Sequence, residues 1–321
     1  MITKPMDVLA NYPIRKSSKQ KNAFISAVVA FAESAHYSVQ VETGPADRKE
    51  TILPNSPFAS KNIVLGDPQK AKFLITAHYD TGNVSPMSAL ILPYNILLQM
   101  LYVFILLMIV FTLSVGFGLA VSFLLGAASL AIPICLFSLA FAFLLCFAVP
   151  LRRPSDNYGS SGVVALLEIA ASVPTNLRSR VCFVLLDKSS GGFIGAECYR
   201  KRHKHSDNQI VIQLDCLGEG DELILFTTKH FRQDQEQILS LSKICGQWGK
   251  KSIILPQKCF TVYPSDYGCF PNGVCIAAFH RNKIVGPYVC HFHEKTNREL
   301  DETNLNIVRA ALITLIGAAE K

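Results

Sequence analysis

The chain has 321 residues, enough for one large domain or two ordinary ones, and half of it is hydrophobic. Its ten cysteines are scattered singly without a CxxC pair, which excludes a small disulfide-stapled scaffold and indicates reduced thiols. The formal net charge of +7 is not accompanied by a basic-aromatic motif. We therefore expect proximity to anionic lipid and no nucleic-acid partner.

The first part of the chain, residues 1–86, predicts helix followed by strands. Residues 18–36 space their apolar side chains for an amphipathic helix. Strands are expected at residues 37–43, 62–66 and 72–77.

A long apolar segment interrupts this pattern. From Thr81 to Leu151 the sequence contains no Asp, Glu, Lys, Arg or His. A bilayer core about 30 Å thick takes roughly 20 apolar residues per helix, so the segment has room for two transmembrane helices or three tight ones. A pair of apolar core helices is the soluble alternative. We expect a transmembrane hairpin inserted at residues 87–151, with helices at about 94–114 and 128–150 and a break at the sequence SVGFG.

The flanks of this segment indicate its orientation. Arg152 and Arg153 follow it directly and the N-terminal arm is also basic, so the positive-inside rule places both flanks in the cytoplasm. The segment lies too deep in the chain to be a signal peptide. The expectation is a multi-pass protein of the cell membrane with two spans and a cytoplasmic domain.

Residues 152–321 return to the pattern of a soluble α/β domain. Helices are expected at residues 161–173, 193–204, 234–249 and 302–320, and strands at 180–187, 208–218, 221–228 and 273–280. Alternating strands and helices predict a mostly parallel central sheet covered by helices on both faces. In such sheets, functional residues gather where the strands' carboxyl ends open into loops.

Possible metal ligands stand at these strand ends. His78 ends one strand with Asp80 two residues later, an arrangement in which a carboxylate orients a ligating imidazole. Asp156 precedes a helix, Asp215 ends a strand, and His291 follows a short apolar piece. Each has an ordinary structural explanation, such as a helix cap for Asp156. Their order along one sheet, His, Asp, Asp, His, instead offers the nitrogen and oxygen donors that suit zinc.

Several separated motifs together resemble metallopeptidase family twenty-eight, the zinc aminopeptidases with two co-catalytic metal ions. They are AHYDT, DNYGSSGVVALLE (with two extra residues), QLDCLGEGD and HFHEKTNRELD. The resemblance covers both halves of the chain and stops only at the apolar segment. It implies a zinc-exopeptidase-like fold, a peptide substrate or ligand, and zinc.

The resemblance also assigns roles residue by residue. His78, Asp156 and Asp215 would form one metal site, with Asp80 orienting His78 and Asp156 bridging to a second site. That second site would take His291 and one glutamate. Asp266, in the sequence SDYGCF, resembles a position in the loop that lines the substrate pocket, or it caps a turn.

Two carboxylates of the family pattern are missing. The family's Glu-Glu pair falls on Ser189, the position of the general base, and Ser190, the position of a metal ligand. A serine hydroxyl cannot act as a base near neutral pH and is a poor anionic ligand. Loss of a general base removes a factor of about 10² to 10⁴ in rate. With one metal ligand replaced as well, one zinc ion is expected rather than two, and a chain without zinc is the alternative.

Two hypotheses about function follow. In the first, the chain is a membrane-anchored zinc aminopeptidase of weak activity. In the second, it is a pseudopeptidase that binds a peptide or protein partner at the cytoplasmic membrane face. In both, His78 and Asp156 must lie on one side of the membrane to share a metal, which requires an even number of spans between them.

Overall fold

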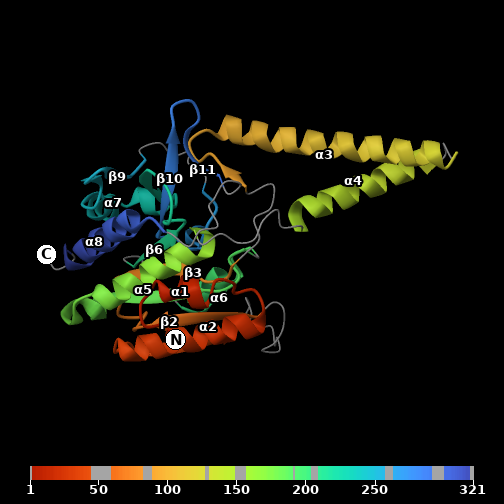
Figure 1. The fold of residues 1–321 in the computed structure, drawn as a ribbon. Helices are drawn as coiled ribbons and strands as arrows, with labels where there is room; N and C mark the ends of the chain where they lie inside the picture. Colours follow the sequence, from red (N-terminus) through yellow and green to blue (C-terminus); the bar gives the residue numbers. More distant parts are fainter. Residues whose placement is uncertain are drawn as a thin grey trace.

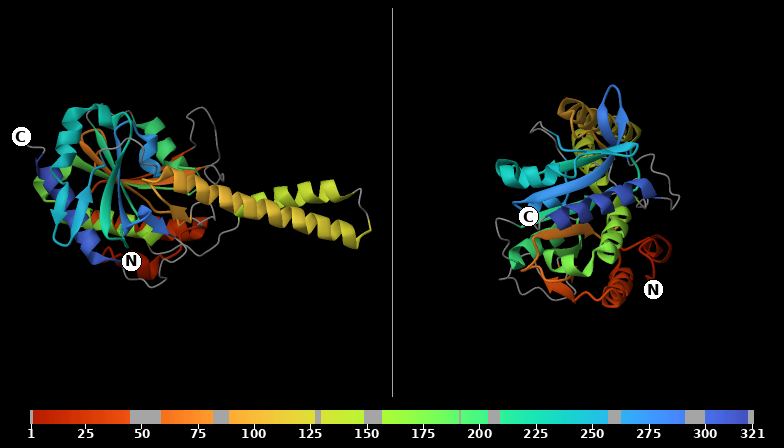
Figure 2. Two further views of the ribbon diagram at one scale, coloured as in Figure 1. Left: turned by 90° about the horizontal axis from the view of Figure 1, so that it is seen from above. Right: turned by 90° about the vertical axis from the view of Figure 1, so that its left-hand side faces the viewer.

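The computed structural model describes residues 2–44, 59–81, 89–126, 130–148, 157–190, 192–203, 209–256, 263–290 and 300–318. It contains an α/β body with a central sheet between helices, and a long helical hairpin that extends away from that body (Figures 1 and 2). Helix α3 begins and helix α4 ends at the end of the hairpin nearer the body (Figure 2).

The central sheet combines a parallel middle with antiparallel edges. Its strands are β1 (Val39–Gly44), β2 (Ser60–Leu65), β3 (Phe73–His78), β4 (Leu90–Ile91), β5 (Val181–Leu186), β6 (Ile210–Asp215), β7 (Glu222–Thr227), β8 (Gly246–Trp248), β9 (Lys251–Ile254), β10 (Gly273–Asn282) and β11 (Gly286–Cys290). The order is β1-β2-β5-β3-β6-β10-β7-β9-β8, with β11 paired to β10 and β4 paired to β11.

Strands β5, β3, β6 and β10 are mutually parallel, as the sequence predicts for a buried α/β sheet. The pairs β1–β2, β2–β5, β7–β10 and β8–β9 are antiparallel, so the sheet is mixed rather than mostly parallel. The difference arises at the edges, where a short connection such as that between β8 and β9 can join antiparallel neighbours without a crossover helix.

Helices cover both faces of the sheet. They are α1 (Asp7–Asn11), α2 (Ser18–Ser34), α5 (Gly162–Ser172), α6 (Ile194–Arg202), α7 (Gln235–Ser242) and α8 (Glu302–Ala318). Residues of α1, α2, α5, α7 and α8 pack with one face of the sheet in the largest core cluster, and α6 packs on the opposite face. Strand β5 shows the division, because Phe183 belongs to the first core and Val184 to the second.

The expected helix at residues 234–249 is wrong in its second half. Helix α7 ends at Ser242, and the chain then forms the β8–β9 hairpin. Gly246 and Gly249 have positive φ angles of 125° and 63°, which interrupt a helix and allow the tight turns. The sequence analysis also missed the short strands β4, β9 and β11.

The hairpin consists of α3 (Ile96–Leu124) and α4 (Ala131–Ala148). The break expected at SVGFG is wrong, because α3 continues through this sequence without interruption. The small residues Ser114 and Gly118 of SVGFG contact α4 instead of forming a turn. Ser138 Oγ donates a hydrogen bond to the Ser114 carbonyl at 2.8 Å, and a Cβ on Gly118 would lie 2.5 Å from Cys135 Sγ. Small residues here allow close helix packing.

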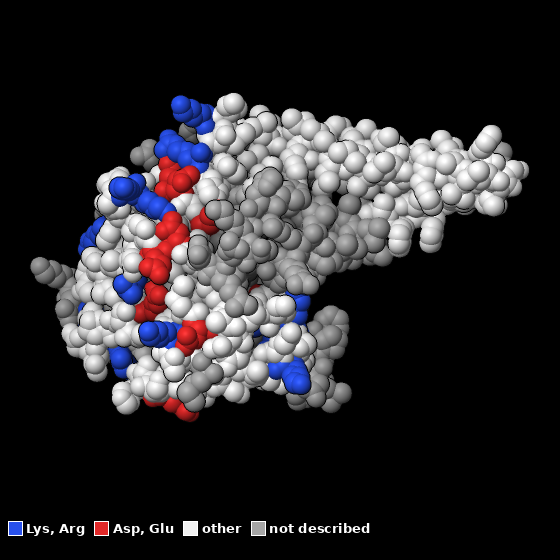
Figure 3. All heavy atoms as spheres, viewed as in Figure 1, with Lys and Arg blue, Asp and Glu red and all other residues white. Residues whose placement is uncertain are grey.

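Within the described residues, α3 is the one helix whose length and composition suit a membrane crossing. At about 1.5 Å per residue its 29 residues span about 44 Å, more than a bilayer core. Its apolar side chains are largely exposed, Leu97 at 76% and Phe123 at 86%, and the visible surface of the hairpin carries no charged side chain (Figure 3).

Candidate functional site

The register of two parallel strands brings His78 and Asp215 together. Thr76 of β3 lies opposite Gln213 of β6, and their side chains are hydrogen-bonded. His78 and Asp215 each come two residues later and therefore point to the same face. His78 Nε2 lies 3.6 Å from Asp215 Oδ1, and both residues are buried.

This pair has the spacing of two zinc ligands. Ligands at about 2.0–2.2 Å from a tetrahedral zinc lie about 3.4 Å apart, close to the observed separation of Nε2 and Oδ1. Asp215 Oδ1 is buried and has no hydrogen-bond partner among the described residues. Its second oxygen accepts a hydrogen bond from Ser265 Oγ at 2.8 Å, which fixes the carboxylate. The donors therefore fit zinc, which would supply a positive charge that polarises a substrate carbonyl.

Asp80 holds the other side of the imidazole. His78 Nδ1 lies 3.5 Å from Asp80 Oδ1 and 3.2 Å from the Asp80 carbonyl oxygen. Such a carboxylate behind a ligating histidine fixes the ring orientation and tautomer. The expected position of Asp80 next to His78 is thus present in the structure.

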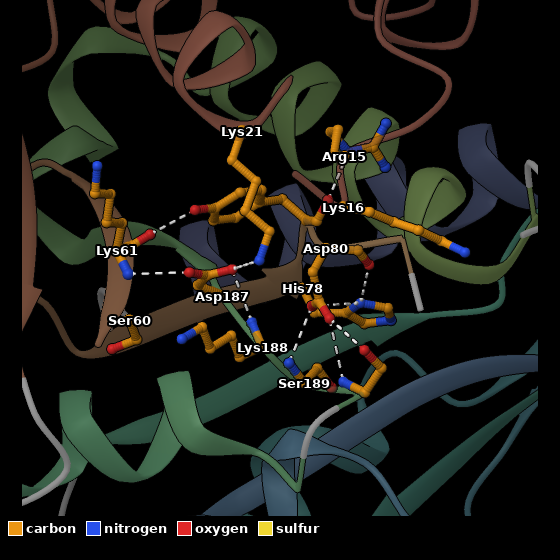
Figure 4. Close-up of polar contacts among 12 residues, drawn as sticks. Arg15, Lys16, Lys21, Ser60, Lys61, His78, Asp80, Asp187, Lys188 and Ser189 are labelled. Carbon is orange, nitrogen blue, oxygen red and sulfur yellow. Dashed lines mark hydrogen bonds and ion pairs between the residues drawn. The ribbon is translucent and has the colours of Figure 1, made fainter. Parts of the chain in front are cut away.

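The two serines are bound to Asp80. The Ser189 amide donates to Asp80 Oδ1 at 3.0 Å, and the Ser190 amide and hydroxyl donate to Oδ2 at 3.2 Å and 2.6 Å (Figure 4). Lys188, which precedes them, has a positive φ of 53°. Ser189 and Ser190 therefore present hydrogen-bond donors that orient Asp80.

The charges of the cluster shift its pKa values in opposite directions. Burial alone would lower the pKa of His78, but hydrogen bonding to Asp215 and Asp80 raises it well above its usual range. Burial would raise the pKa of both carboxyls, but the hydrogen bonds and charge of His78 hold them below their usual range. The imidazole and the two carboxylates stabilise one another's charged forms.

Two acids near the serines in sequence, Asp187 and Glu197, have partners away from His78. Asp187 points away from His78, and its carboxylate accepts hydrogen bonds from the Lys21 ammonium and the Lys61 amide (Figure 4). Glu197 lies on α6 and forms an ion pair with Arg200 at 3.1 Å. Both acids are therefore occupied by structural interactions.

Asp266 is a second buried acid, besides Asp80, that lies near Ser189. It begins a short 3₁₀ helix, is fully buried, and accepts a long hydrogen bond of 3.4 Å from Gln213 Nε2. Its Oδ1 has no hydrogen-bond partner among the described residues. Burial raises the pKa of Asp266 to about 7, against the opposing charge of His78 and a hydrogen bond with Ser189. The sequence placed Asp266 near the substrate but gave no sign of this burial.

Sequence reasoning missed two further residues of the site. Gly159, in the π-helical turn Asn157–Ser161, has a φ of 83°, and a Cβ there would lie 3.1 Å from His78 Cε1. Fully buried Arg15 donates to the carbonyls of Tyr79 and Gly159, and its amide donates to Thr81 Oγ1. Arg15 thus ties together the two chain segments that flank the hairpin. Neither contact has a signal in local sequence spacing.

Two of the predicted metal ligands, Asp156 and His291, lie outside the described residues. In the part of the chain that is described, no group of three or more His, Cys, Asp and Glu side chains is placed to hold a metal ion. His78 and Asp215 are the two predicted ligands that the structure brings together.

The fold and this strand-end site define a class, the zinc-exopeptidase-like α/β proteins. The sequence profile of peptidase family M28 matches residues 156–316, half of the chain. The chain belongs to peptidase family M28. No curated protein sequence matches it significantly.

Solved structures with the same fold cover nearly the whole chain. The glutaminyl cyclase of Porphyromonas gingivalis superposes with a TM-score of 0.60 at 16% identity, covering 98% of this chain and 96% of that one. A Zn-dependent exopeptidase from Parabacteroides distasonis gives 0.55 at 12%, with coverage of 98% and 96%. A leucine aminopeptidase precursor from Bacteroides thetaiotaomicron gives 0.55 at 14%, with coverage of 97% and 93%. At these identities the likeness concerns the fold.

Proposed function

We propose that this chain is a membrane-anchored member of peptidase family M28 that binds one zinc ion and the amino-terminal part of a peptide or protein partner, without efficient hydrolysis. His78 and Asp215 would hold the zinc together with Asp156. The observation that carries the proposal is the pair Ser189 and Ser190, which orient Asp80 where the family has a base and a ligand.

The loss of the base alone is large. A positioned general base contributes about 10² to 10⁴ in rate, and a neutral serine hydroxyl cannot take up a proton near pH 7. Asp187 and Glu197 are engaged elsewhere. Binding of a peptide carbonyl does not need the base, so recognition can persist where turnover is lost.

Weak peptidase activity is the alternative function, and the position of Asp266 favours it. This residue places a buried carboxylate beside Ser189, the position of the general base. Asp266, which comes from a different loop, would then act as the general base in place of the family's glutamate. Substitution of Asp266 separates this alternative from the binding function.

The membrane anchor is the hairpin of α3 and α4. Apolar side chains cover α3, α4 has 18 residues that span about 27 Å, and both ends of the hairpin return to the same body. Together with the basic residues that flank the segment, this supports two spans with the α/β body in the cytoplasm. The bilayer and a peptide would be its partners, with no role for nucleic acid.

Zinc content and aminopeptidase assays on the purified full chain test the proposal. We expect about one zinc per chain, lost in His78→Ala, and no chelator-sensitive release of amino-terminal residues. Peptides beginning with glutamine should be included, because some structural neighbours are glutaminyl cyclases. The double variant Ser189→Glu with Ser190→Glu should bind more zinc and gain hydrolysis.

Three results would decide against parts of the proposal. Robust chelator-sensitive hydrolysis by the unmodified chain would establish a peptidase, and its loss in Asp266→Asn would identify the substitute acid. Absence of bound zinc in the unmodified chain would refute the metal site. Retention of zinc by His78→Ala would place the ion elsewhere.

A further inference from the structure

A pocket of about 430 Å³ lies at the base of the hairpin, away from the strand-end site. Tyr94, two residues before α3 begins, forms one wall. Arg281, Lys283 and Pro287 of the β10–β11 hairpin also line the pocket. This volume falls within the range of about 300–1,000 Å³ typical of small-molecule sites.

The pocket is fixed relative to α3. Cys290 of β11 pairs with Leu90 of β4, and the Gln99 side chain in the first turns of α3 bonds to the Leu90 carbonyl and the Leu92 amide. The Asn95 side chain caps α3 by accepting a hydrogen bond from the Leu98 amide at 3.1 Å. If α3 enters the bilayer, as the proposed function requires, the pocket opens at the level of the lipid headgroups.

The lining of the pocket is basic overall. Of its eight lining residues, Arg281 and Lys283 are basic and Glu222 is acidic. Glu222 is nearly buried and already paired with Arg281 Nη1, which leaves the charge of Lys283 and the other guanidinium nitrogens facing the pocket. Asp221 accepts a hydrogen bond from the Arg281 amide and lies near His280, outside the lining. Basic and acidic side chains alternate along this edge of the molecule, with basic ones uppermost near the uncharged hairpin (Figure 3).

The turn that carries the basic residues also exposes an apolar side chain. Ile284, next to Lys283, is 87% exposed. The Asn282 side chain accepts hydrogen bonds from the amides of Ile284 and Val285, which fixes the turn. An exposed isoleucine that follows Lys283 and Arg281 in sequence, together with a tyrosine that lines the same pocket, is the composition found at membrane interfaces.

We propose that this pocket binds the phosphate headgroup of an anionic phospholipid of the leaflet next to the α/β body. Arg281 and Lys283 would contact the phosphate and the Tyr94 hydroxyl would donate a hydrogen bond, with the exposed Ile284 beside them at the membrane surface. The site would fix the height and rotation of the body relative to the membrane surface. This inference rests on the proposed insertion of α3.

Lipid binding by the full chain in detergent micelles tests the proposal. The probes are fluorescent phosphatidylglycerol and fluorescent phosphatidylcholine. Each basic residue near anionic lipid contributes about 1 kcal/mol, which is about fivefold in affinity, so we expect Arg281→Gln with Lys283→Gln to weaken phosphatidylglycerol binding by roughly 25-fold. Phosphatidylcholine binding should change little.

The chain offers a matched control at a distance from the pocket. Arg200 and Lys201 on α6 are exposed, and Arg200 is ion-paired with Glu197 as Arg281 is with Glu222. The double variant Arg200→Gln with Lys201→Gln removes the same charges and should retain the preference for phosphatidylglycerol. An equal loss in both double variants would show a general charge effect and overturn the pocket.

Two further measurements separate the possible failures. Displacement of the lipid from the unmodified chain by millimolar glycerol 3-phosphate would assign the pocket to a soluble phosphate and overturn the lipid source. Extraction of the unmodified chain from membranes by alkaline carbonate would refute the insertion itself. A chain that resists extraction but binds both lipids equally would refute the headgroup site alone.

Discussion

At the scale of single residues, the site is built around one imidazole. His78 lies between Asp215, whose Oδ1 is 3.6 Å from Nε2, and Asp80, whose Oδ1 is 3.5 Å from Nδ1. Ser190 donates its hydroxyl to Asp80, which in turn lies beside His78. If His78 and Asp215 bind zinc, as we propose, Ser190 would support that pair indirectly.

Gly159 gives a direct test of this arrangement. In Gly159→Ala the new Cβ would lie 2.9 Å from the Asp80 carbonyl oxygen and 3.1 Å from His78 Cε1, so the imidazole must move. Changes that displace a ligand from its supporting contacts cost about 10–100-fold in metal affinity. We expect such a loss in zinc affinity, measured by competition with a chromogenic chelator.

Gly286→Ala is the control for Gly159→Ala. Gly286 has nearly the same φ, 80° against 83°, but a Cβ added there would have nothing within 4 Å. Both variants carry the backbone cost of alanine at positive φ, and only Gly159→Ala should lose zinc affinity. Equal zinc affinities would show that Gly159 does not support His78.

Asp266 predicts a pH dependence of stability. Its pKa of about 7 in the folded chain lies above the value of 3.8 for a free side chain. Between these values the folded state binds the extra proton, so this group lowers the free energy of unfolding as pH rises through that window, by a few kcal/mol at most. Above pH 7 its effect is constant.

Asp266→Asn should remove this contribution. The variant should gain stability relative to the parent as pH increases from about 4 to 7, with no further gain above that range. Urea unfolding of the zinc-free chain in detergent at pH 5 and pH 8 measures the difference. Parallel stability profiles for variant and parent would show that Asp266 does not titrate near neutral pH.

At the scale of elements, the hairpin is held by close contact of its two helices. A Cβ on Gly118 would lie 2.8 Å from Cys135 Cα, whereas Gly116 in the same helix has nothing within 4 Å. Overpacking of a close contact costs about 1–3 kcal/mol. Gly118→Val should therefore lower the thermal unfolding temperature in micelles, and Gly116→Val should not. Equal unfolding temperatures would indicate that α3 and α4 do not pack through Gly118.

The strands, the hairpin and Arg15 show which features can be predicted from the sequence and which cannot. Continuous apolar runs identified β3, β5 and β6, and their ends located His78 and Asp215, because burial on both faces leaves a clear composition. The small residues of SVGFG predicted a break, since sequence alone does not distinguish a turn from a contact surface. Arg15 was missed because its partners are distant in the chain and meet only in the folded protein.

At the scale of the whole molecule, the apolar helical hairpin lies in the chain between two segments that meet near the site. Arg15 bonds to Tyr79, before the hairpin, and to Gly159, after it, so the two flanks are held together on one side. Because the segments before and after the hairpin are held together, the chain between them can cross a membrane only an even number of times. If the hairpin crosses the membrane twice, its tip lies on the far side from both segments, and cysteine labelling can test this.

Three exposed positions report the topology: Lys19 in α2, Gly126 after α3 and Ser172 at the end of α5. Each is changed to cysteine, and sealed membrane vesicles are treated with a maleimide that cannot cross the bilayer, with the parent chain as background. We expect Lys19→Cys and Ser172→Cys to be labelled from the same, cytoplasmic side and Gly126→Cys from the other. Labelling of Lys19 and Ser172 from opposite sides would mean an odd number of spans, which the contacts of Arg15 exclude. Labelling of all three from one side would instead mean that the hairpin lies along the membrane surface, with its exposed apolar side chains only partly inserted.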